Sequence, residues 1–157
     1  MKIWIDADAC PVRVKEIIFK ASERLKVPVT LVSNKTMSIP RSALVDFVLV
    51  DKSFDAADLY IVQEASNFDL VITADIPLAK ALVDKGVLAL NYRGQLYTPE
   101  NVQEAFAIRN LMQELREGGI IRGGPAPFNN KDAEKFANAF DKELTRLLAK
   151  SARSLKT

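Results

Sequence analysis

The chain has 157 residues, of which 48% are hydrophobic and 27% are charged, with 22 basic and 20 acidic side chains. These values are typical of one globular domain with a single hydrophobic core. There is no histidine, and Cys10 is the one cysteine. The composition therefore excludes histidine-dependent nucleophilic catalysis, histidine-ligated zinc and an intrachain disulfide. Carboxylates, amines, hydroxyls and a bound metal remain as catalytic groups.

The sequence also predicts where the protein resides. No stretch approaches the roughly 18 apolar residues that a membrane span requires, and Asp6 falls where a signal peptide would have its apolar core. With a single cysteine as well, we expect a cytoplasmic protein without a membrane partner. The net charge of +2 is too small to indicate nucleic-acid binding by itself.

Short apolar runs alternate with helical patterns over the first ninety residues. Apolar residues recur at three- and four-residue spacing from Val14 to Leu25, after Pro11, which predicts an amphipathic helix. Strands are predicted at 2–6, 29–32, 47–50, 70–73 and 87–90, and further helices at 55–66 and 76–85. Because the strands are continuously apolar and separated by helices, we expect an α/β fold with a parallel sheet covered on both faces.

The last third of the chain is predicted to be helical. Thr98-Pro99-Glu100 is a typical helix start, and an apolar stripe follows it at Val102, Phe106, Leu111, Met112 and Leu115. A loop rich in glycine and proline at 123–127 precedes a last helix, which Asn129 or Asn130 can cap. We expect one domain over residues 1–157, with a helical extension from about residue 99.

Four aspartates are candidates for a metal centre. Asp6 and Asp8 follow the first predicted strand, Asp75 follows the fourth, and Asp58 opens the helix after the third. Parallel sheets bind ligands at the carboxyl ends of their strands, so these side chains meet if the first and fourth strands are neighbours. Clustered carboxylates repel one another, and a hard cation such as Mg²⁺ or Mn²⁺ removes that conflict. We therefore predict that all four aspartates are catalytic metal ligands.

Each aspartate also has a structural interpretation. Asp55 and Asp58 fit a helix capping box, Asp75 fits an N-cap, and Asp8 could stabilise the start of the first helix. Asp6 fits such roles least, because an unpaired carboxylate at the end of a central strand is unfavourable. Because the aspartates are expected at one edge of the sheet, we favour a metal site over these separate structural roles.

Polar residues in the loops around this edge are candidates for substrate binding. They are Asn34, Lys35, Asn91, Arg93 and Arg122, and among them Lys35 and Arg93 are suited to contact phosphate. Solvated surface is the alternative interpretation for each of them. We interpret Cys10 as a buried packing residue, since there is no histidine to activate it as a nucleophile.

The sequence resembles the bacterial YaiI/YqxD family, which is placed among PIN-like domains. The motifs that carry the resemblance span nearly the whole chain: Asp6-Ala7-Asp8-Ala9-Cys10-Pro11-Val12, Ser33-Asn34, Ala57-Asp58, Thr73-Ala74-Asp75-Ile76-Pro77-Leu78-Ala79 and Asn91-Tyr92-Arg93-Gly94. The resemblance implies a PIN-like three-layer sandwich with a mainly parallel five-stranded sheet of order 3-2-1-4-5. It also implies helices on both faces and extra C-terminal helices, and the order makes strands one and four neighbours.

The resemblance also implies a site. PIN nucleases hold Mg²⁺ or Mn²⁺ with an aspartate of the first strand, an acid on the helix after strand three, and a Thr-x-Asp motif at the end of strand four. Asp6, Asp58 and Asp75 match these positions, with Thr73 as the hydroxyl of the last motif. Asp8 departs from the general pattern.

Three functions are consistent with the sequence. The leading hypothesis is metal-dependent cleavage of phosphodiesters, with single-stranded RNA as the favoured substrate. The second is a haloacid-dehalogenase-like phosphatase, because Asp6-Ala7-Asp8 resembles that family's nucleophile and acid, although Asp75 has no adjacent acid to complete the metal site. The third is a non-catalytic module that binds RNA or protein.

Overall fold

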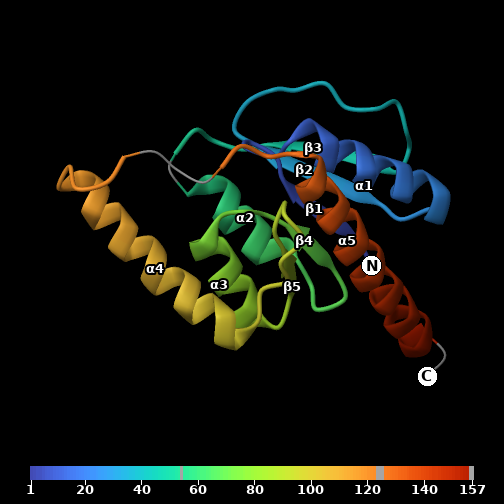
Figure 1. Ribbon diagram of the computed structural model, residues 1–157. Helices are drawn as coiled ribbons and strands as arrows, with labels where there is room; N and C mark the ends of the chain where they lie inside the picture. Colours follow the sequence, from blue (N-terminus) through green and yellow to red (C-terminus); the bar gives the residue numbers. More distant parts are fainter. Residues whose placement is uncertain (54, 123–125, 156–157) are drawn as a thin grey trace.

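The computed structural model describes residues 1–53, 55–122 and 126–155 (Figure 1). Within these ranges it contains one parallel sheet with the strand order β3-β2-β1-β4-β5, as the resemblance implied. The strands are β1 (Ile3–Asp6), β2 (Val29–Ser33), β3 (Val45–Leu49), β4 (Leu70–Ile72) and β5 (Leu88–Leu90). Their bounds lie within two residues of the predicted ones.

Helices cover both faces of the sheet (Figure 1). They are α1 (Val12–Leu25), α2 (Ala56–Glu64), α3 (Ile76–Lys85), α4 (Pro99–Glu117) and α5 (Asn130–Leu155). α1 and α5 pack together on one face, α2 and α3 lie on the other, and α4 packs against α3. None of these helices is long and apolar enough to cross a membrane. Residues 123–125 of the predicted glycine- and proline-rich loop lie outside the described residues.

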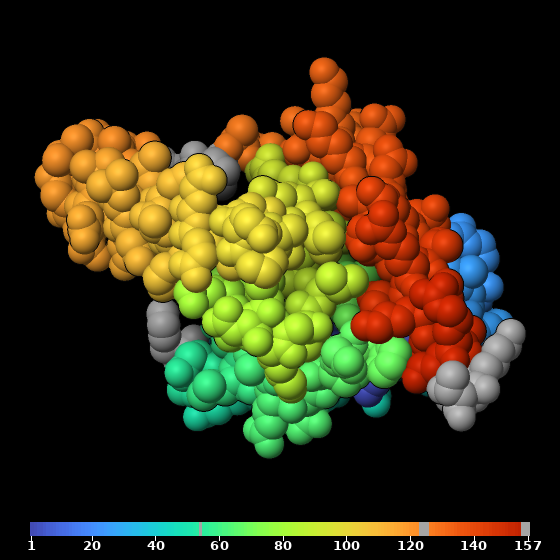
Figure 2. Space-filling model, turned by 90° about the horizontal axis from the view of Figure 1, so that it is seen from below, coloured from blue at the N-terminus to red at the C-terminus, as the bar shows by residue number. Residues whose placement is uncertain are grey.

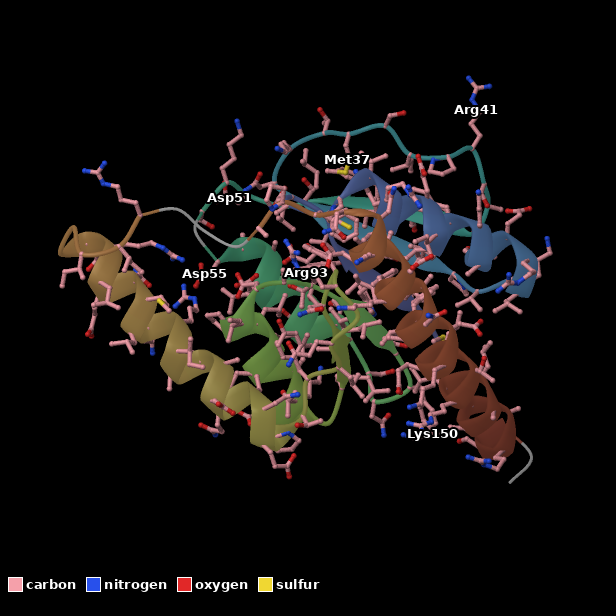
Figure 3. All side chains as sticks on the ribbon, viewed as in Figure 1. Met37, Arg41, Asp51, Asp55, Arg93 and Lys150 are labelled. Carbon is pink, nitrogen blue, oxygen red and sulfur yellow. The ribbon has the colours of Figure 1, made fainter. Side chains whose placement is uncertain are left out.

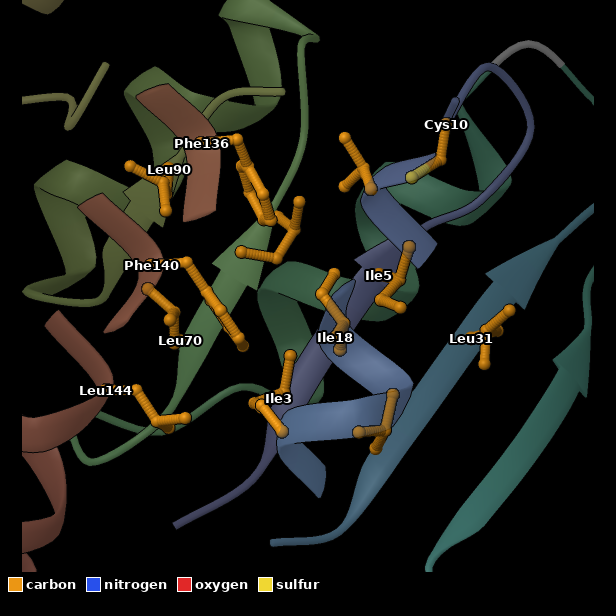
Figure 4. Close-up of a cluster of buried hydrophobic side chains, with 14 of the residues drawn as sticks. Ile3, Ile5, Cys10, Ile18, Leu31, Leu70, Leu90, Phe136, Phe140 and Leu144 are labelled. Atoms are coloured by element: carbon orange, nitrogen blue, oxygen red, sulfur yellow. The ribbon is translucent and has the colours of Figure 1, made fainter. Parts of the chain in front are cut away.

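The alternation of side chains along each strand supplies two hydrophobic cores. Ile3 and Ile5 of β1 belong to the core beneath α1 and α5, whereas Trp4 belongs to the core beneath α2 and α3. In Figure 4, Phe136 and Phe140 of α5 extend into the first core. Burial on both faces explains why the strands are continuously apolar in sequence. Cys10 is also buried in the first core, as predicted.

The apolar stripe predicted a helix, which α4 confirms, but the stripe is fully buried only at its first residue. Val102 is 1% exposed, but Leu111 is 53% exposed and Met112 is 39% exposed. α4 has 19 residues and its partner α3 has 10, so at 1.5 Å per residue α4 is roughly 13 Å longer. Its C-terminal half therefore extends beyond α3, and it forms an arm in Figure 2.

The ends of the last two helices confirm the predicted caps. The hydroxyl of Thr98 accepts a hydrogen bond from the backbone N–H of Asn101, and the side chain of Asn101 accepts one from the N–H of Thr98. At the start of α5, Asn129 and Asp132 form the same reciprocal pair. Of the two asparagines considered for that cap, Asn129 makes the contact.

Candidate functional site

The four predicted aspartates line one cavity at the carboxyl ends of the strands. Its volume is about 320 Å³, and its walls include Asp6, Asp8, Asp58 and Asp75. β1 pairs with β2 on one side and with β4 on the other, so the segments that follow these strands meet at this edge. α2 adds Asp58 from above the sheet. We refer to this space as the carboxylate cavity.

Asp6 is held by the Thr73 hydroxyl. The Oγ1 of Thr73 donates to Oδ2 of Asp6 at 2.7 Å and accepts from the backbone N–H of Asp75 at 3.0 Å. Burial raises the pKa of Asp6 from 3.8 to about 6. The hydrogen bond from Thr73 lowers this pKa, and the charges of Asp75 and Asp8 raise it. Asp6 therefore takes up a proton more readily than an ordinary aspartate.

Asp58, like Asp6, has a raised pKa. Burial, followed by the charges of Asp75, Asp6 and Asp55, raises the pKa of Asp58 to about 7. A contact with the Asp75 carboxyl group is the smallest of the contributions that raise this pKa. Asp58 therefore takes up a proton more readily than an ordinary aspartate, as Asp6 does.

The structural interpretations of Asp55 and Asp75 have different outcomes. Asp75 is the N-cap of α3, since its Oδ1 accepts from the N–H of Leu78 at 3.0 Å, and it lines the cavity as well. Asp55 occupies the N-cap position of α2, but its side chain makes no capping hydrogen bond. The predicted capping box of Asp55 and Asp58 is therefore wrong.

Asp8 has partners that the other aspartates lack. Its Oδ1 accepts from the Ser33 hydroxyl at 2.5 Å and from the backbone N–H of Asn34 at 3.2 Å. Both donors lie at the end of β2, the strand beside β1. Asp8 thus ties the segment after β1 to the segment after β2, and it lines the cavity at the same time.

Carboxylate oxygens are the donors that Mg²⁺ and Mn²⁺ prefer, so the chemistry of Asp6, Asp58 and Asp75 fits a divalent cation. The raised pKa values of Asp6 and Asp58 record a repulsion that such a cation would relieve. In the described part of the chain, however, no group of three or more acidic or cysteine side chains is placed to hold a metal ion as it stands. Binding would therefore require these carboxylates to rotate toward a common point.

The predicted substrate-binding residues are distributed over several surfaces. Asn34 lines the carboxylate cavity, Lys35 is exposed beside it in sequence, and Thr73 is buried against Asp6. Arg93 forms an ion pair with Asp132 at 2.7 Å and donates to the carbonyl of Ala126. Its guanidinium is therefore already engaged by the start of α5.

Asn91 and Arg122 also lie apart from the carboxylates. The side chain of Asn91 accepts hydrogen bonds from the backbone N–H groups of Arg93 and Gln95, which fixes the turn after β5. Arg122 lines a different groove, beside α4. The structure brings the four aspartates and Asn34 together in one cavity but does not bring these two residues there.

Tyr92 lines the cavity and was not predicted as a site residue. Its hydroxyl donates to the backbone carbonyl of Asp6 at 2.7 Å, which holds the end of β1 in place. Gly94, two residues later, has a φ of +88°, and a Cβ there would lie 2.5 Å from the carbonyl oxygen of Lys135. The Asn91-Tyr92-Arg93-Gly94 motif could have indicated that Tyr92 lies near the site, because its glycine permits this close approach to α5.

The comparisons with known proteins agree with the sequence motifs. The sequence profile described as "Uncharacterized BCR, YaiI/YqxD family" matches residues 4–146. The chain is 55% identical over 148 residues to a UPF0178 protein of Geobacter metallireducens, covering 94% of this chain and 96% of that protein. A UPF0178 protein of Myxococcus xanthus is 51% identical over 148 residues, covering 94% and 97% of the two chains.

No solved structure matches the chain. The profile covers all four aspartates of the carboxylate cavity, and the relatives match across almost their whole length. The chain belongs to the YaiI/YqxD family.

Proposed function

We propose that this protein is a metal-dependent phosphodiesterase that cleaves single-stranded RNA in the carboxylate cavity. The observation that carries the proposal is the convergence of Asp6, Asp58 and Asp75 on one cavity in which the pKa values of Asp6 and Asp58 are raised to about 6 and about 7. Mg²⁺ or Mn²⁺, when bound, would polarise a phosphoryl oxygen and lower the pKa of a water molecule.

The chain's own residues orient these ligands. The Thr73 hydroxyl fixes one oxygen of Asp6, and the first turn of α3 fixes one oxygen of Asp75. The Tyr92 hydroxyl donates a hydrogen bond to the backbone carbonyl of Asp6, so the carboxylate projects from a fixed backbone. Such support on rigid strand and helix ends is what a catalytic constellation requires.

The sequence is also compatible with two other functions. A haloacid-dehalogenase-like phosphatase requires a lysine beside its aspartate pair, and no lysine is among the described residues that line the cavity. The side chain of Asp8, the acid in that scheme, is instead bonded to Ser33 and Asn34. The other function is a non-catalytic binding module, and the following assay distinguishes it from a nuclease.

The test is cleavage of single-stranded RNA and DNA of mixed sequence with Mn²⁺ or Mg²⁺, for wild type, Asp6→Asn and Asp46→Asn. Asp46 is exposed on β3 and does not line the cavity, so its variant matches the change in charge. We expect cleavage by wild type and Asp46→Asn and a loss of at least about 100-fold in Asp6→Asn. Equal cleavage by all three proteins would refute the proposal, and RNA binding without cleavage by any of them would favour the binding module.

A further inference from the structure

A second and larger concavity runs beside α4. Its volume is about 790 Å³, and it is lined by one face of α4, by Ile76 and Gln95, and by Ile121 and Arg122 beyond the helix. We refer to it as the α4 groove. The part of α4 that extends past α3 forms its outer wall, which is the arm seen in Figure 2.

The lining of the α4 groove is positively charged. Arg109, Arg116 and Arg122 line it, against Glu104 as the one acid among its described residues. Arg109 and Arg116 are seven residues apart, so they lie on the same face of the helix about 10 Å from each other. Arg109 and Arg116 thus form a row along the groove, and Arg122 follows beyond the helix. Such a row of cations complements a chain of regularly spaced anions.

Apolar side chains lie between these arginines. Ile108 is 47% exposed and Met112 is 39% exposed, and both line the groove together with Ile121. Aliphatic surface of this kind can contact the faces of nucleic-acid bases while the arginines contact phosphates. Because the described lining contains no aromatic ring for stacking, the phosphates supply most of the affinity and bases are not distinguished.

The α4 groove adjoins the carboxylate cavity at the start of α3. Ile76 lines the groove, and its chain neighbours Ala74 and Asp75 line the cavity. A polyanion cannot be held by the carboxylates themselves, so its cationic contacts must lie outside the cavity. Arg93 is bonded to Asp132. Three arginines line the α4 groove, which meets the cavity at the start of α3.

We propose that the α4 groove binds single-stranded nucleic acid through its phosphates, at Arg109, Arg116 and Arg122, and directs the strand toward Asp75. Cleavage of the bound strand near Asp75 rests on the proposed function. Binding in the groove does not, because it requires no hydrolysis. A protein segment or a second copy of the chain would cover the apolar residues, whereas a polyanion also complements the excess of arginines over acids among the described lining residues.

The test measures binding of a fluorescent single-stranded oligonucleotide of about 12 nucleotides, as RNA and as DNA, in the presence of a chelator. The variant is Arg109→Gln with Arg122→Gln. Its control is Arg24→Gln with Arg41→Gln, which removes the same charge from two exposed arginines; Arg41 lies on the opposite side of the molecule from α4 (Figure 3). Affinities are measured between about 50 and 200 mM salt.

We expect the groove variant to bind about tenfold more weakly, with the slope of log K against log salt reduced by about 1.4, or about 0.7 for each lost phosphate contact. The control variant should bind like wild type, and poly-U, poly-A and poly-C should bind alike. Equal affinity and slope in the groove variant would overturn the proposal. A wild-type dimer that Ile108→Ser dissociates, in a protein that does not bind the oligonucleotide, would overturn it in favour of a second copy.

The outcomes separate this inference from the proposed function. Binding that depends on the groove arginines, without cleavage in the presence of Mn²⁺, supports the groove and refutes the hydrolase. Metal-dependent cleavage with the same KM in wild type and the groove variant supports the hydrolase and refutes the groove. A raised KM with an unchanged kcat in the groove variant supports both.

Discussion

Two halves of the carboxylate cavity differ in how they accommodate negative charge. Asp6 and Asp58 lie among other carboxylates, and burial together with this repulsion raises their pKa values. Asp8, in the segment after β1, accepts hydrogen bonds from the Ser33 hydroxyl and the Asn34 N–H. The same residue type thus has a raised pKa at Asp6 and Asp58 and forms a structural tie between two segments at Asp8. We infer that Asp6 and Asp58 act on the ligand and that Asp8 positions the loops.

The largest expected difference between the two halves is in catalysis. We expect Asp58→Asn to lower the rate of metal-dependent RNA cleavage by at least about 100-fold, because it removes a charged ligand. Asp8→Asn should lower the rate by about tenfold or less, since the amide oxygen can still accept from Ser33 and Asn34. Single-turnover rates at saturating Mn²⁺ check this difference. Equal losses would show that Asp8 is a ligand too, as the sequence analysis predicts.

The second expectation concerns the pH dependence of stability without metal. In the unfolded chain Asp6 titrates near 3.8, and in the folded protein near 6, so the folded state binds more protons between these values. Raising the pH from about 4 to about 7 should therefore lower the free energy of unfolding, by about 2 kcal/mol for Asp6. Asp58 acts in the same direction.

Urea unfolding across this pH range measures the effect, and the Asp6→Asn variant is the control. Asn cannot titrate, so the variant should lose the part of the decrease that Asp6 supplies and keep the part that Asp58 supplies. It should be as stable as wild type, or more so, near pH 7. A wild-type protein whose stability rises over this range in parallel with the variant would contradict the assignment of raised pKa values to the cavity.

A smaller effect is expected at Asp8. Asp8→Ala leaves the Asn34 N–H without its acceptor and leaves the Ser33 hydroxyl only the carbonyl of Lys35 as an acceptor. This loss should cost about 1–3 kcal/mol. Asp8→Asn should cost much less, because it retains an oxygen at the same position. Chemical denaturation of the metal-free variants tests this order, and an Asp8→Ala protein more stable than wild type would place Asp8 with the repelled carboxylates.

The smallest effect is expected at Asp75, which belongs to both groups because it lines the cavity and caps α3. Asp75→Ala should lose the cap, at about 1 kcal/mol, and should relieve repulsion at the same time. Asp75→Asn should relieve the repulsion and keep the cap. The Asn variant should therefore melt at a higher temperature than the Ala variant, and the reverse order would show that the cap contributes nothing.

Much of the fold, and the grouping of Asp6 and Asp75 at one edge of the sheet, could be predicted from the sequence. Apolar runs located the strands, and the Thr98 and Gly86 signals located helix ends within a residue. The strand order came from the resemblance, since no local pattern states which strands are neighbours. Once β1 lies between β2 and β4, the positions of Asp6 and Asp75 at one edge follow from the chain itself.

Contacts between distant segments could not be predicted in this way. The bond between Asp8 and Ser33 depends on the pairing of β1 with β2, and the ion pair of Arg93 with Asp132 joins residues 39 positions apart. The stripe on α4 indicated a helix correctly, but periodicity does not state which neighbour covers it. α4 is longer than α3, and its apolar residues consequently line an open groove.

The most direct test of the central claim, that the carboxylate cavity binds a divalent cation, is the shift in melting temperature with Mn²⁺ at a pH above about 7. Binding to the native state at a hundredfold excess over Kd adds about 2.7 kcal/mol to the free energy of unfolding. We expect wild type and the exposed control Asp46→Asn to melt at a higher temperature with Mn²⁺, and Asp6→Asn to show no shift. An Asp6→Asn protein that responds to Mn²⁺ as wild type does would contradict the account.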